Sequence, residues 1–160
     1  MDYDIDESLV MRVQDLKILN PIKIISRPFN SIELIPIILI LRFLKLIDNN
    51  DIKKIFTGIV FLIYLKFYFR RDRPYIQNAQ IQNRSKELII DKYSFPSGHS
   101  FVSFLIIYIL YEKHKKNYIL IIPMLVGLSR VYLGVHYVTD IFFGFMFSYL
   151  YSNIYDRYIN

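Results

Sequence analysis

The sequence has no cysteine among its 160 residues, and this absence excludes several kinds of site. Without thiols the chain can hold no disulfide scaffold, no zinc–thiolate centre and no cysteine nucleophile. Glycine and proline are also scarce, with five and six residues, whereas 54% of the chain is hydrophobic. Disordered and low-complexity chains have a different composition. The length and composition therefore indicate one folded domain.

A positively charged leader is also absent, because the first residues read MDYDIDESL and are acidic. We therefore expect no secretory signal peptide in this segment. The formal net charge is nevertheless +6, and such a basic balance suits binding to nucleic acid, to anionic lipid or to an anionic substrate. The cations lie among apolar segments rather than along one solvated stripe, so nucleic acid is not an expected partner.

Five segments of the chain are apolar on every face, as buried or membrane helices are. They are residues 32–47, 55–69, 101–111, 118–132 and 138–151. A helix needs about 20 residues to cross a bilayer core, and flanking tyrosines, lysines and capping residues bring most segments near that length. A soluble helical protein would have too few amphipathic helices to cover five apolar ones. The sequence therefore predicts an all-α helical bundle, integral to the membrane, with about five transmembrane helices.

The N-terminal stretch 8–30 mixes apolar and charged positions. Leu9, Val13 and Leu16 recur at helical spacing, and cations such as Arg12 interrupt the run. This pattern predicts an amphipathic helix that either lies along a membrane surface or packs on a core, and the sequence leaves both alternatives open. We therefore divide the chain into an N-terminal amphipathic segment, 1–31, and a membrane-embedded domain, 32–160.

Two cations mark the end of the second apolar segment. Lys66 and Arg73 lie seven residues apart. If one helix runs through both, they share a face at its end, and Pro74 then stops or turns the chain. Cations in this position usually extend toward lipid headgroups, so the pair alone indicates little.

The third apolar segment is preceded by FPSGHS, residues 95–100. Ser97 can cap a helix there, and the free N–H groups of a helix start form an anion site. Gly98 lets a ligand approach the backbone, and His99 can give or take a proton. The alternative is a simple turn and helix cap.

A third polar cluster follows the fourth apolar segment. Arg130 ends that segment, and His136 and Asp140 come next with a spacing of four residues. On a helical turn this spacing lets the carboxylate hold one ring nitrogen and leave the other free. An activated nucleophile needs such an arrangement, although an ordinary His–Asp pair has it too.

The three clusters fall on one side if the five apolar segments alternate across a membrane. Lys66, Arg73 and Arg130 then surround one pocket, and guanidinium groups suit phosphate. Two histidines in different settings fit a phosphoryl transfer with a nucleophile and a separate acid. The sequence has no cluster of carboxylates that could bind magnesium, so we expect neither a metal nor a cofactor. The cations would then stabilise the charge on the phosphoryl group.

Together the clusters resemble the motifs of the type 2 phosphatidic acid phosphatase superfamily, whose fold is shared with vanadium haloperoxidases. The family's lysine, six residues and Arg-Pro match residues 66–74, and its Pro-Ser-Gly-His matches residues 96–99. Its Ser-Arg, five residues, His, three residues and Asp match residues 129–140. The resemblance covers residues 55–151. It implies that 32–160 is a phosphatase domain acting on a phosphomonoester or diphosphate of a membrane lipid, including polyprenyl diphosphates.

The resemblance also implies a role for each motif residue. His136 would attack the phosphorus and form a phosphohistidine, and Asp140 would orient it. His99 would protonate the leaving group and then activate water. The phosphoryl oxygens would be held by Lys66, Arg73, Ser97, Gly98 and Arg130. Many membrane members of the family have six transmembrane helices, whereas this chain has room for about five and the amphipathic segment.

Three alternatives remain at this point. The chain could be a vanadate-dependent haloperoxidase, a phosphatase of soluble phosphate esters on the same fold, or a non-enzymatic membrane protein that keeps the motifs. Its short apolar sequence argues against the first, and the complete motif set argues against the last.

The sidedness of the site follows from five lysines on the face opposite the clusters. They are Lys53, Lys54, Lys113, Lys115 and Lys116. By the positive-inside rule this face is cytoplasmic, so we expect the active site on the non-cytoplasmic face. The basic loop 70–95 opposes this assignment, and a glycosylation triplet at Asn83 would agree with it in a eukaryotic host.

Overall fold

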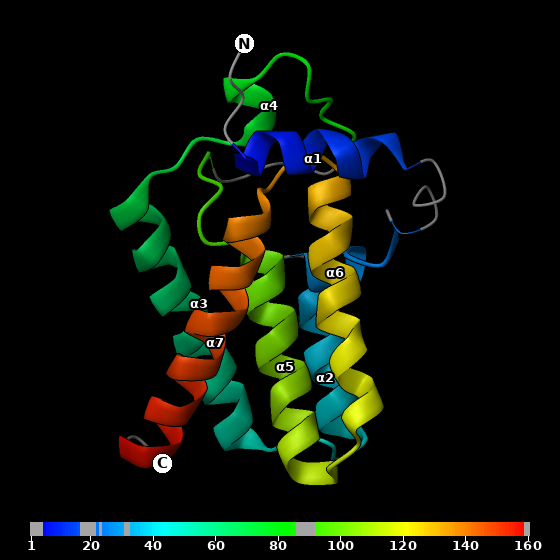
Figure 1. The fold of residues 1–160 in the computed structure, drawn as a ribbon. Coiled ribbons are helices and arrows are strands. Elements are labelled where there is room, and N and C mark those ends of the chain that lie inside the picture. The colour runs from blue at the N-terminus through cyan, green and yellow to red at the C-terminus, as the bar shows by residue number, and fades with distance from the viewer. Residues whose placement is uncertain (1–4, 17–21, 23, 31–32, 86–91, 159–160) are drawn as a thin grey trace.

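The computed structural model of the chain describes residues 5–16, 22, 24–30, 33–85 and 92–158. Every regular element in these ranges is a helix (Figure 1). The longer helices are α1 (Ile5–Asp15), α2 (Leu34–Phe43), α3 (Asn49–Phe69), α5 (Gly98–His114), α6 (Ile121–Tyr132) and α7 (Val138–Tyr158). The short ones are η2 (Arg27–Phe29), α4 (Pro74–Gln77) and η3 (Asn117–Leu120). The predicted all-α fold is confirmed, and the five apolar segments correspond to α2, α3, α5, α6 and α7.

Helix α5 is the centre of the bundle and packs against α3, α6 and α7. The helices alternate in direction, so the last turns of α3 and α6 and the first turns of α5 and α7 lie at the same end (Figure 1). Helix α1 lies across this end and contacts α6 and α7. We name it the α1 end, and we name the opposite end the far end. The chain thereby collects the three polar clusters at the α1 end.

The interior of the bundle is filled by aliphatic and aromatic side chains. Its main cluster consists of Leu34, Ile47, Ile55, Leu62, Phe101, Val102, Leu105, Ile106 and Ile109. A smaller cluster lies beneath α1 and consists of Val10, Ile81, Val131, Tyr137 and Ile141. Leu105 at the centre of α5 has no exposed surface, and truncating such a residue to alanine typically costs about 2–5 kcal/mol. The smaller cluster shows that α1 packs on a core, which is one of the two alternatives for this segment.

Several helix boundaries differ from the sequence-based expectation. Helix α3 begins at Asn49 rather than at residue 55, because Asp48 accepts hydrogen bonds from Asn50 and Asp51 and forms a capping box with Asp51. The charged residues 48–54 therefore supply the N-cap and the first turns of α3. Helix α5, by contrast, begins at Gly98 with Ser97 as its N-cap, as predicted.

The N-terminal segment is also shorter than its pattern indicated. Helix α1 ends at Asp15, and residues 17–21 of the expected amphipathic helix lie outside the described residues. The expected boundary between 1–31 and 32–160 lies outside them too, and this division stays a prediction.

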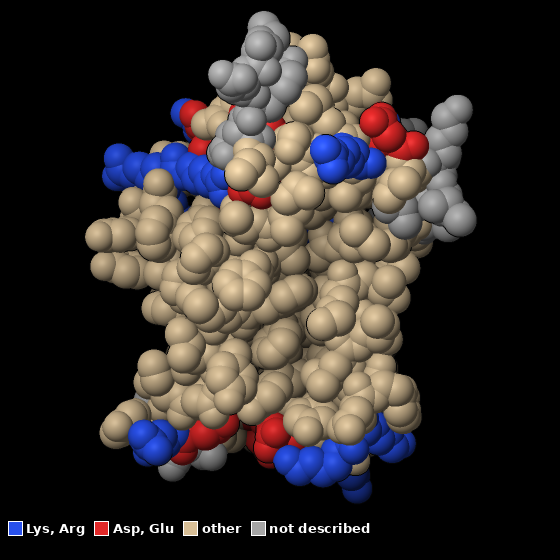
Figure 2. Space-filling view, in the orientation of Figure 1, with Lys and Arg blue, Asp and Glu red and all other residues tan. Residues whose placement is uncertain are grey.

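The surface of the bundle is apolar around its middle. Figure 2 shows a broad band without charged side chains between two charged rims, at the α1 end and at the far end. Large side chains in the middle of the helices are exposed, including Leu39, Phe56, Val60, Phe142 and Leu150. None of the described helices combines the length and the mean hydropathy required of a membrane span.

Candidate active site

The three polar clusters meet in one cavity of about 770 Å³ at the α1 end of the bundle. Six of the eight predicted site residues line it. They are Lys66, Arg73, Gly98, His99, Arg130 and His136. The other two, Ser97 and Asp140, are fully buried behind this lining. The prediction that the clusters lie together is therefore confirmed by their positions, and the role of each residue stays a prediction.

Three cations converge on the cavity from different elements. Lys66 lies in the last turn of α3, Arg73 precedes α4, and Arg130 lies in the last turn of α6. Their exposed fractions are 7%, 4% and 2%. Such buried cations are costly unless they are paired or bind an anion, so their convergence indicates an anion site.

The two cations of the first motif do not share a helix, so the condition under which they would share its face is not met. Helix α3 ends at Phe69, and Arg70 adopts the left-handed conformation with φ of 50°. The chain therefore turns back before it reaches Arg73. Lys66 and Arg73 still line the same cavity, because this turn brings Arg73 over the bundle end.

Hydrogen bonds to backbone carbonyls and a hydroxyl hold the cations. The Lys66 Nζ donates to the Tyr93 carbonyl at 2.9 Å, and the Arg73 Nη1 donates to the Val135 carbonyl at 3.1 Å. The Arg130 Nη1 donates to the Ser26 Oγ at 3.2 Å. These acceptors orient the side chains at the polar end of the cavity.

The turn between α6 and α7 presents His136. It passes through Gly134, whose φ of +74° favours glycine. A Cβ there would lie 2.4 Å from the Gln82 carbonyl, so a larger residue has no room. His136 itself is 2% exposed and faces the cavity. The tight turn therefore fixes the histidine close to the cations.

Asp140 lies directly behind His136. Its Oδ2 is 3.5 Å from the His136 Nδ1 and accepts a hydrogen bond from the Tyr137 N–H at 2.9 Å. The carboxylate therefore faces the predicted ring nitrogen, but at this separation it forms no hydrogen bond with Nδ1.

The charges around His136 determine its protonation. Burial lowers the pKa of His136 well below 6.5, and the nearby cations Arg73, Lys66 and Arg130 lower this pKa further. The ring is therefore neutral at neutral pH. A neutral imidazole whose far nitrogen faces a carboxylate can act as a nucleophile.

The start of α5 contributes Gly98 and His99 to the cavity. Ser97 caps the helix and accepts from the Ser100 N–H at 3.4 Å. The Ser97 N–H donates to the Asp140 carbonyl at 3.0 Å, which ties the start of α5 to the start of α7. This tie places His99 and His136 in the same cavity.

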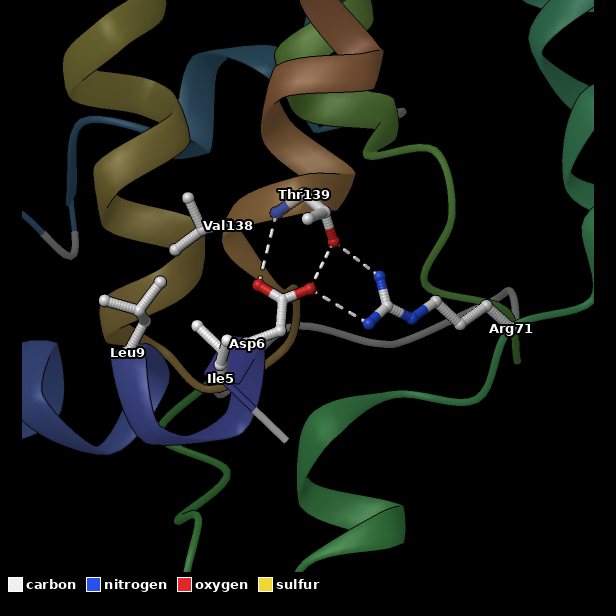
Figure 3. A pocket seen from close by; sticks show the side chains of 6 residues that line it. All are labelled: Ile5, Asp6, Leu9, Arg71, Val138 and Thr139. Atoms are coloured by element: carbon white, nitrogen blue, oxygen red, sulfur yellow. Dashed lines mark hydrogen bonds and ion pairs between the residues drawn. The ribbon is translucent and has the colours of Figure 1, made fainter. Parts of the chain in front are cut away.

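Arg71 is a residue that the sequence analysis missed as part of the site. Its guanidinium group bonds to Asp140, and also to Thr139 and to Asp6 of α1, as Figure 3 shows for the last two. In the sequence, Arg71 is only one charge of the basic loop 70–95, because it falls in the spacer of the first motif. Its place between Lys66 and Arg73, two residues with site roles, was the available signal.

The rest of α1 is also fastened to the site segments. Asn78 donates to Glu7 at 2.9 Å. The Gln14 side chain donates to the Gln82 carbonyl at 2.7 Å and to the Tyr132 carbonyl at 3.3 Å, and it accepts from the Gln82 N–H at 3.1 Å. Polar side chains thus hold both ends of α1 over the site.

The cavity extends from its polar end along an apolar arm between α2 and α3. Ile35 and Ile38 line it from α2, and Ile55, Phe56 and Ile59 line it from α3. The arm is therefore a groove that a hydrocarbon chain fits, and its inner end lies at the cations and histidines.

A sequence profile described as the PAP2 superfamily matches residues 52–160. This match covers more than half of the chain, and the chain therefore belongs to the PAP2 superfamily. The resemblance found in the motifs is confirmed.

One curated relative is phosphatidylglycerophosphatase B of Bacillus subtilis (strain 168). It is 52% identical over 66 aligned residues, with 33% of this chain and 32% of that protein covered. The chain thus spans about a third of the length of this curated relative.

Two crystal structures share the fold. LpxE of Aquifex aeolicus has a TM-score of 0.74 and 23% identity, with 98% of each chain covered. A transmembrane PAP2 type phosphatidylglycerolphosphate phosphatase from Bacillus subtilis has a TM-score of 0.67 and 24% identity. That match covers 96% of this chain and 85% of the other. The arrangement of the helices is therefore that of these two proteins.

Proposed function

We propose that the chain is a membrane-embedded phosphatase that hydrolyses a lipid phosphate without a metal. The cavity carries this proposal, because its polar end holds three cations and two histidines and its arm is apolar. A phosphate group fits the first part and a hydrocarbon chain fits the second. Phosphatidylglycerophosphate is the first substrate to test, since the curated relative is a phosphatidylglycerophosphatase.

The first chemical step breaks the phosphorus–oxygen bond to the lipid. The neutral Nε2 of His136 attacks the phosphorus, and Asp140 stabilises the positive charge that develops on the ring. Burial and the nearby cations lower the pKa of His99 well below 6.5, so His99 takes up its proton when the anionic phosphate binds, and it donates this proton to the departing lipid oxygen. The products of this step are the lipid alcohol and a phosphohistidine.

The second step hydrolyses the phosphohistidine. His99, now neutral, accepts a proton from a water molecule as the water attacks the phosphorus. The phosphorus–nitrogen bond breaks, which releases inorganic phosphate and restores neutral His136. Lys66, Arg73 and Arg130 balance the charge on the phosphoryl oxygens in both steps.

The apolar band in Figure 2 supports the membrane part of the proposal. Exposed apolar surface of this extent marks contact with lipid or with a partner. In a bilayer, the charged rims lie at the two interfaces, and the site lies beside the rim at the α1 end. A lipid can then keep its chains in the arm while its headgroup reaches His136.

The decisive experiment measures phosphate release by detergent-purified protein. The substrates are phosphatidylglycerophosphate, phosphatidic acid, a polyprenyl diphosphate and a soluble aryl phosphate. Each is assayed with EDTA, with vanadate and beside the His136→Ala variant. We expect release that resists EDTA, is inhibited by vanadate and falls about ten-thousand-fold or more in His136→Ala.

Each measurement in this experiment has an outcome that would contradict a different part of the proposal. Loss of activity in EDTA that is restored by a divalent cation contradicts metal independence. Equal kcat/KM for the aryl phosphate and the lipids contradicts a lipid substrate. Full activity of folded His136→Ala contradicts the phosphohistidine. Halide oxidation with vanadate and peroxide, in place of hydrolysis, would identify a haloperoxidase.

The sidedness of the site can be tested with single cysteines, because the chain has none of its own. Ala79→Cys places a thiol at the α1 end, and Lys116→Cys places one at the far end. Both positions are exposed. A membrane-impermeant maleimide should label only Ala79→Cys from the non-cytoplasmic side of intact cells or vesicles. Labelling of only Lys116→Cys from that side would reverse the orientation.

A further inference from the structure

Arg71 lies between two carboxylates that come from distant parts of the chain. Its Nη1 donates to the Asp140 Oδ1 at 3.0 Å, and its Nη2 donates to the Asp6 Oδ2 at 3.0 Å. The Nη1 also donates to the Thr139 Oγ1 at 2.6 Å, and that hydroxyl donates to Asp6 (Figure 3). The guanidinium fork therefore joins the first helix of the chain to the last.

Contacts of both its side chain and its backbone hold Arg71 in place. Its guanidinium carbon lies 3.8 Å from the centre of the Tyr137 ring. Its carbonyl accepts a hydrogen bond from the Ser94 N–H at 2.8 Å. A planar guanidinium group held between a ring and two carboxylates has little freedom to turn. A shift of either carboxylate would therefore move Arg71 and, through it, the other carboxylate.

Asp140 depends on Arg71 because it is fully buried. A buried carboxylate needs a paired charge and hydrogen bonds to stay ionised. Arg71 supplies the charge at Oδ1, and Oδ2 faces His136 and the Tyr137 N–H. The bond at Oδ1 thus determines which way Oδ2 points.

We propose that Arg71 is a positioning residue for His136, acting through Asp140, and that Asp6 of α1 holds Arg71 in place. This proposal rests on the proposed function, in which His136 is the nucleophile. Arg71 and Asp6 line a separate cavity of about 350 Å³ (Figure 3). They do not line the cavity that takes the substrate. Their loss should therefore lower kcat and leave KM nearly unchanged.

The test compares variants of two neighbouring arginines. Arg71→Met removes the guanidinium at nearly constant size, and Arg70→Met is its matched control. Arg70 is exposed, and its Nε bonds only locally to the Phe67 carbonyl at 2.9 Å. We expect kcat to fall about 10- to 100-fold in Arg71→Met and to stay within about two-fold in Arg70→Met, since partners of a functional histidine typically have effects of this size.

Two further variants separate positioning from general damage. Arg71→Lys keeps the positive charge and should recover part of the kcat that Arg71→Met loses. Asp6→Asn should lower kcat less than Arg71→Met does, because Asp140 keeps Arg71 as its partner. The double variant Asp6→Asn/Arg71→Met should be no slower than Arg71→Met alone, since Asp6 acts through Arg71. Thermal melting and size-exclusion profiles in detergent establish that each variant is folded. If Arg71→Met does not fold, Arg71→Lys and Asp6→Asn decide the same question.

The outcomes separate this proposal from the proposed function. Wild-type protein that releases no phosphate, or that works without His136, overturns the proposed function and this proposal with it. Wild-type activity that requires His136, together with unchanged kcat in folded Arg71→Met, overturns only the role of Arg71. An equal loss in Arg70→Met, a rise in KM without a fall in kcat, or additive losses in the double variant would also overturn it.

Discussion

Helix α3 carries two buried lysines, one near each end of the bundle, and their surroundings differ. Lys54 is 5% exposed, and its Nζ lies 2.7 Å from a carboxylate oxygen of Asp156 at the far end. Lys66 is 7% exposed and lines the cavity at the α1 end, where Arg73 and Arg130 add two more cations. Both lysines are equally removed from water, so burial alone does not distinguish a functional cation.

The charge of the neighbours makes the distinction. At the far end, cations meet carboxylates. Lys113, for example, bonds to Asp48 at 2.7 Å and to Asp51. At the α1 end, cations of the cavity bond to carbonyl and hydroxyl oxygens. The buried lysine of the far end is thus paired with a carboxylate, whereas the cavity at the α1 end gathers three cations beside two histidines.

Replacing the two lysines in turn should give the largest contrast. Lys66→Met removes a cation that we propose holds the phosphoryl group, and kcat/KM should fall about 100- to 1,000-fold. Lys54→Met should leave kcat/KM within about two-fold and lower the stability by about 1 kcal/mol, because Asp156 is half exposed and stays solvated. Phosphate release and thermal melting measure the two effects. Equal losses of activity would contradict the comparison.

The protonation of His136 should reflect both its burial and the neighbouring cations. Its pKa is lowered by burial first and then by the cations, so the neutral ring persists as the pH falls below 6.5 and is lost only at the lowered pKa. In ¹⁵N-histidine spectra, the His136 signals should remain those of a neutral ring at pH 6.5, with His136→Gln providing the assignment. A protonated ring at that pH would contradict the burial of His136 beside the cations.

The two glycines of the site should respond differently to the same substitution. Gly134→Ala puts a Cβ at positive φ and 2.4 Å from the Gln82 carbonyl, and such strain costs about 1–3 kcal/mol. Gly98→Ala is the matched control, since its Cβ would lie at ordinary distances of 3.5 Å from Leu62 and 3.7 Å from Lys66. Thermal melting should therefore detect a loss only in Gly134→Ala. A similar loss in both variants would contradict the packing of this turn.

The smallest effect is expected at the far end. The hydrogen bond from Lys113 is the main cause that lowers the pKa of Asp48 from 3.8 to about 2. The resulting stability is present above the ordinary pKa and lost as the pH falls through the lowered one. Asp48 is mostly exposed, so Lys113→Met should cost only about 0.2–1 kcal/mol at pH 7, and less near pH 2. A cost that is independent of pH would show that lost packing, and not the ion pair, is responsible.

The fold was largely predictable because each apolar segment encodes its own helix. The helix boundaries were less predictable, because a helix can extend over charged residues that cap it. Asp48 and Asp51 look like a solvated turn in the sequence, yet they form the capping box that starts α3 six residues earlier than expected. The docking of α1 depends on tertiary contacts such as those of Gln14, which no periodicity reveals.

The site was predictable where a motif has fixed spacing. Lys66, His99 and His136 lie in one cavity as expected, since alternating helices bring their segments to one end. Arg71 and Asp6 were missed for a physical reason. Their function depends on a contact between residues 65 positions apart, and each alone looks like an exposed charge.

The contacts of α1 also determine the order in which the molecule can be completed during synthesis. Asp6 is synthesised 133 residues before Thr139. Helix α1 must therefore wait for its contacts with α7 until that helix has been made. A nascent chain that stops before α7 lacks Asp140 and Thr139, so it lacks two of the three groups that Arg71 binds. The network that joins α1 to α7 can form only when this last helix is present.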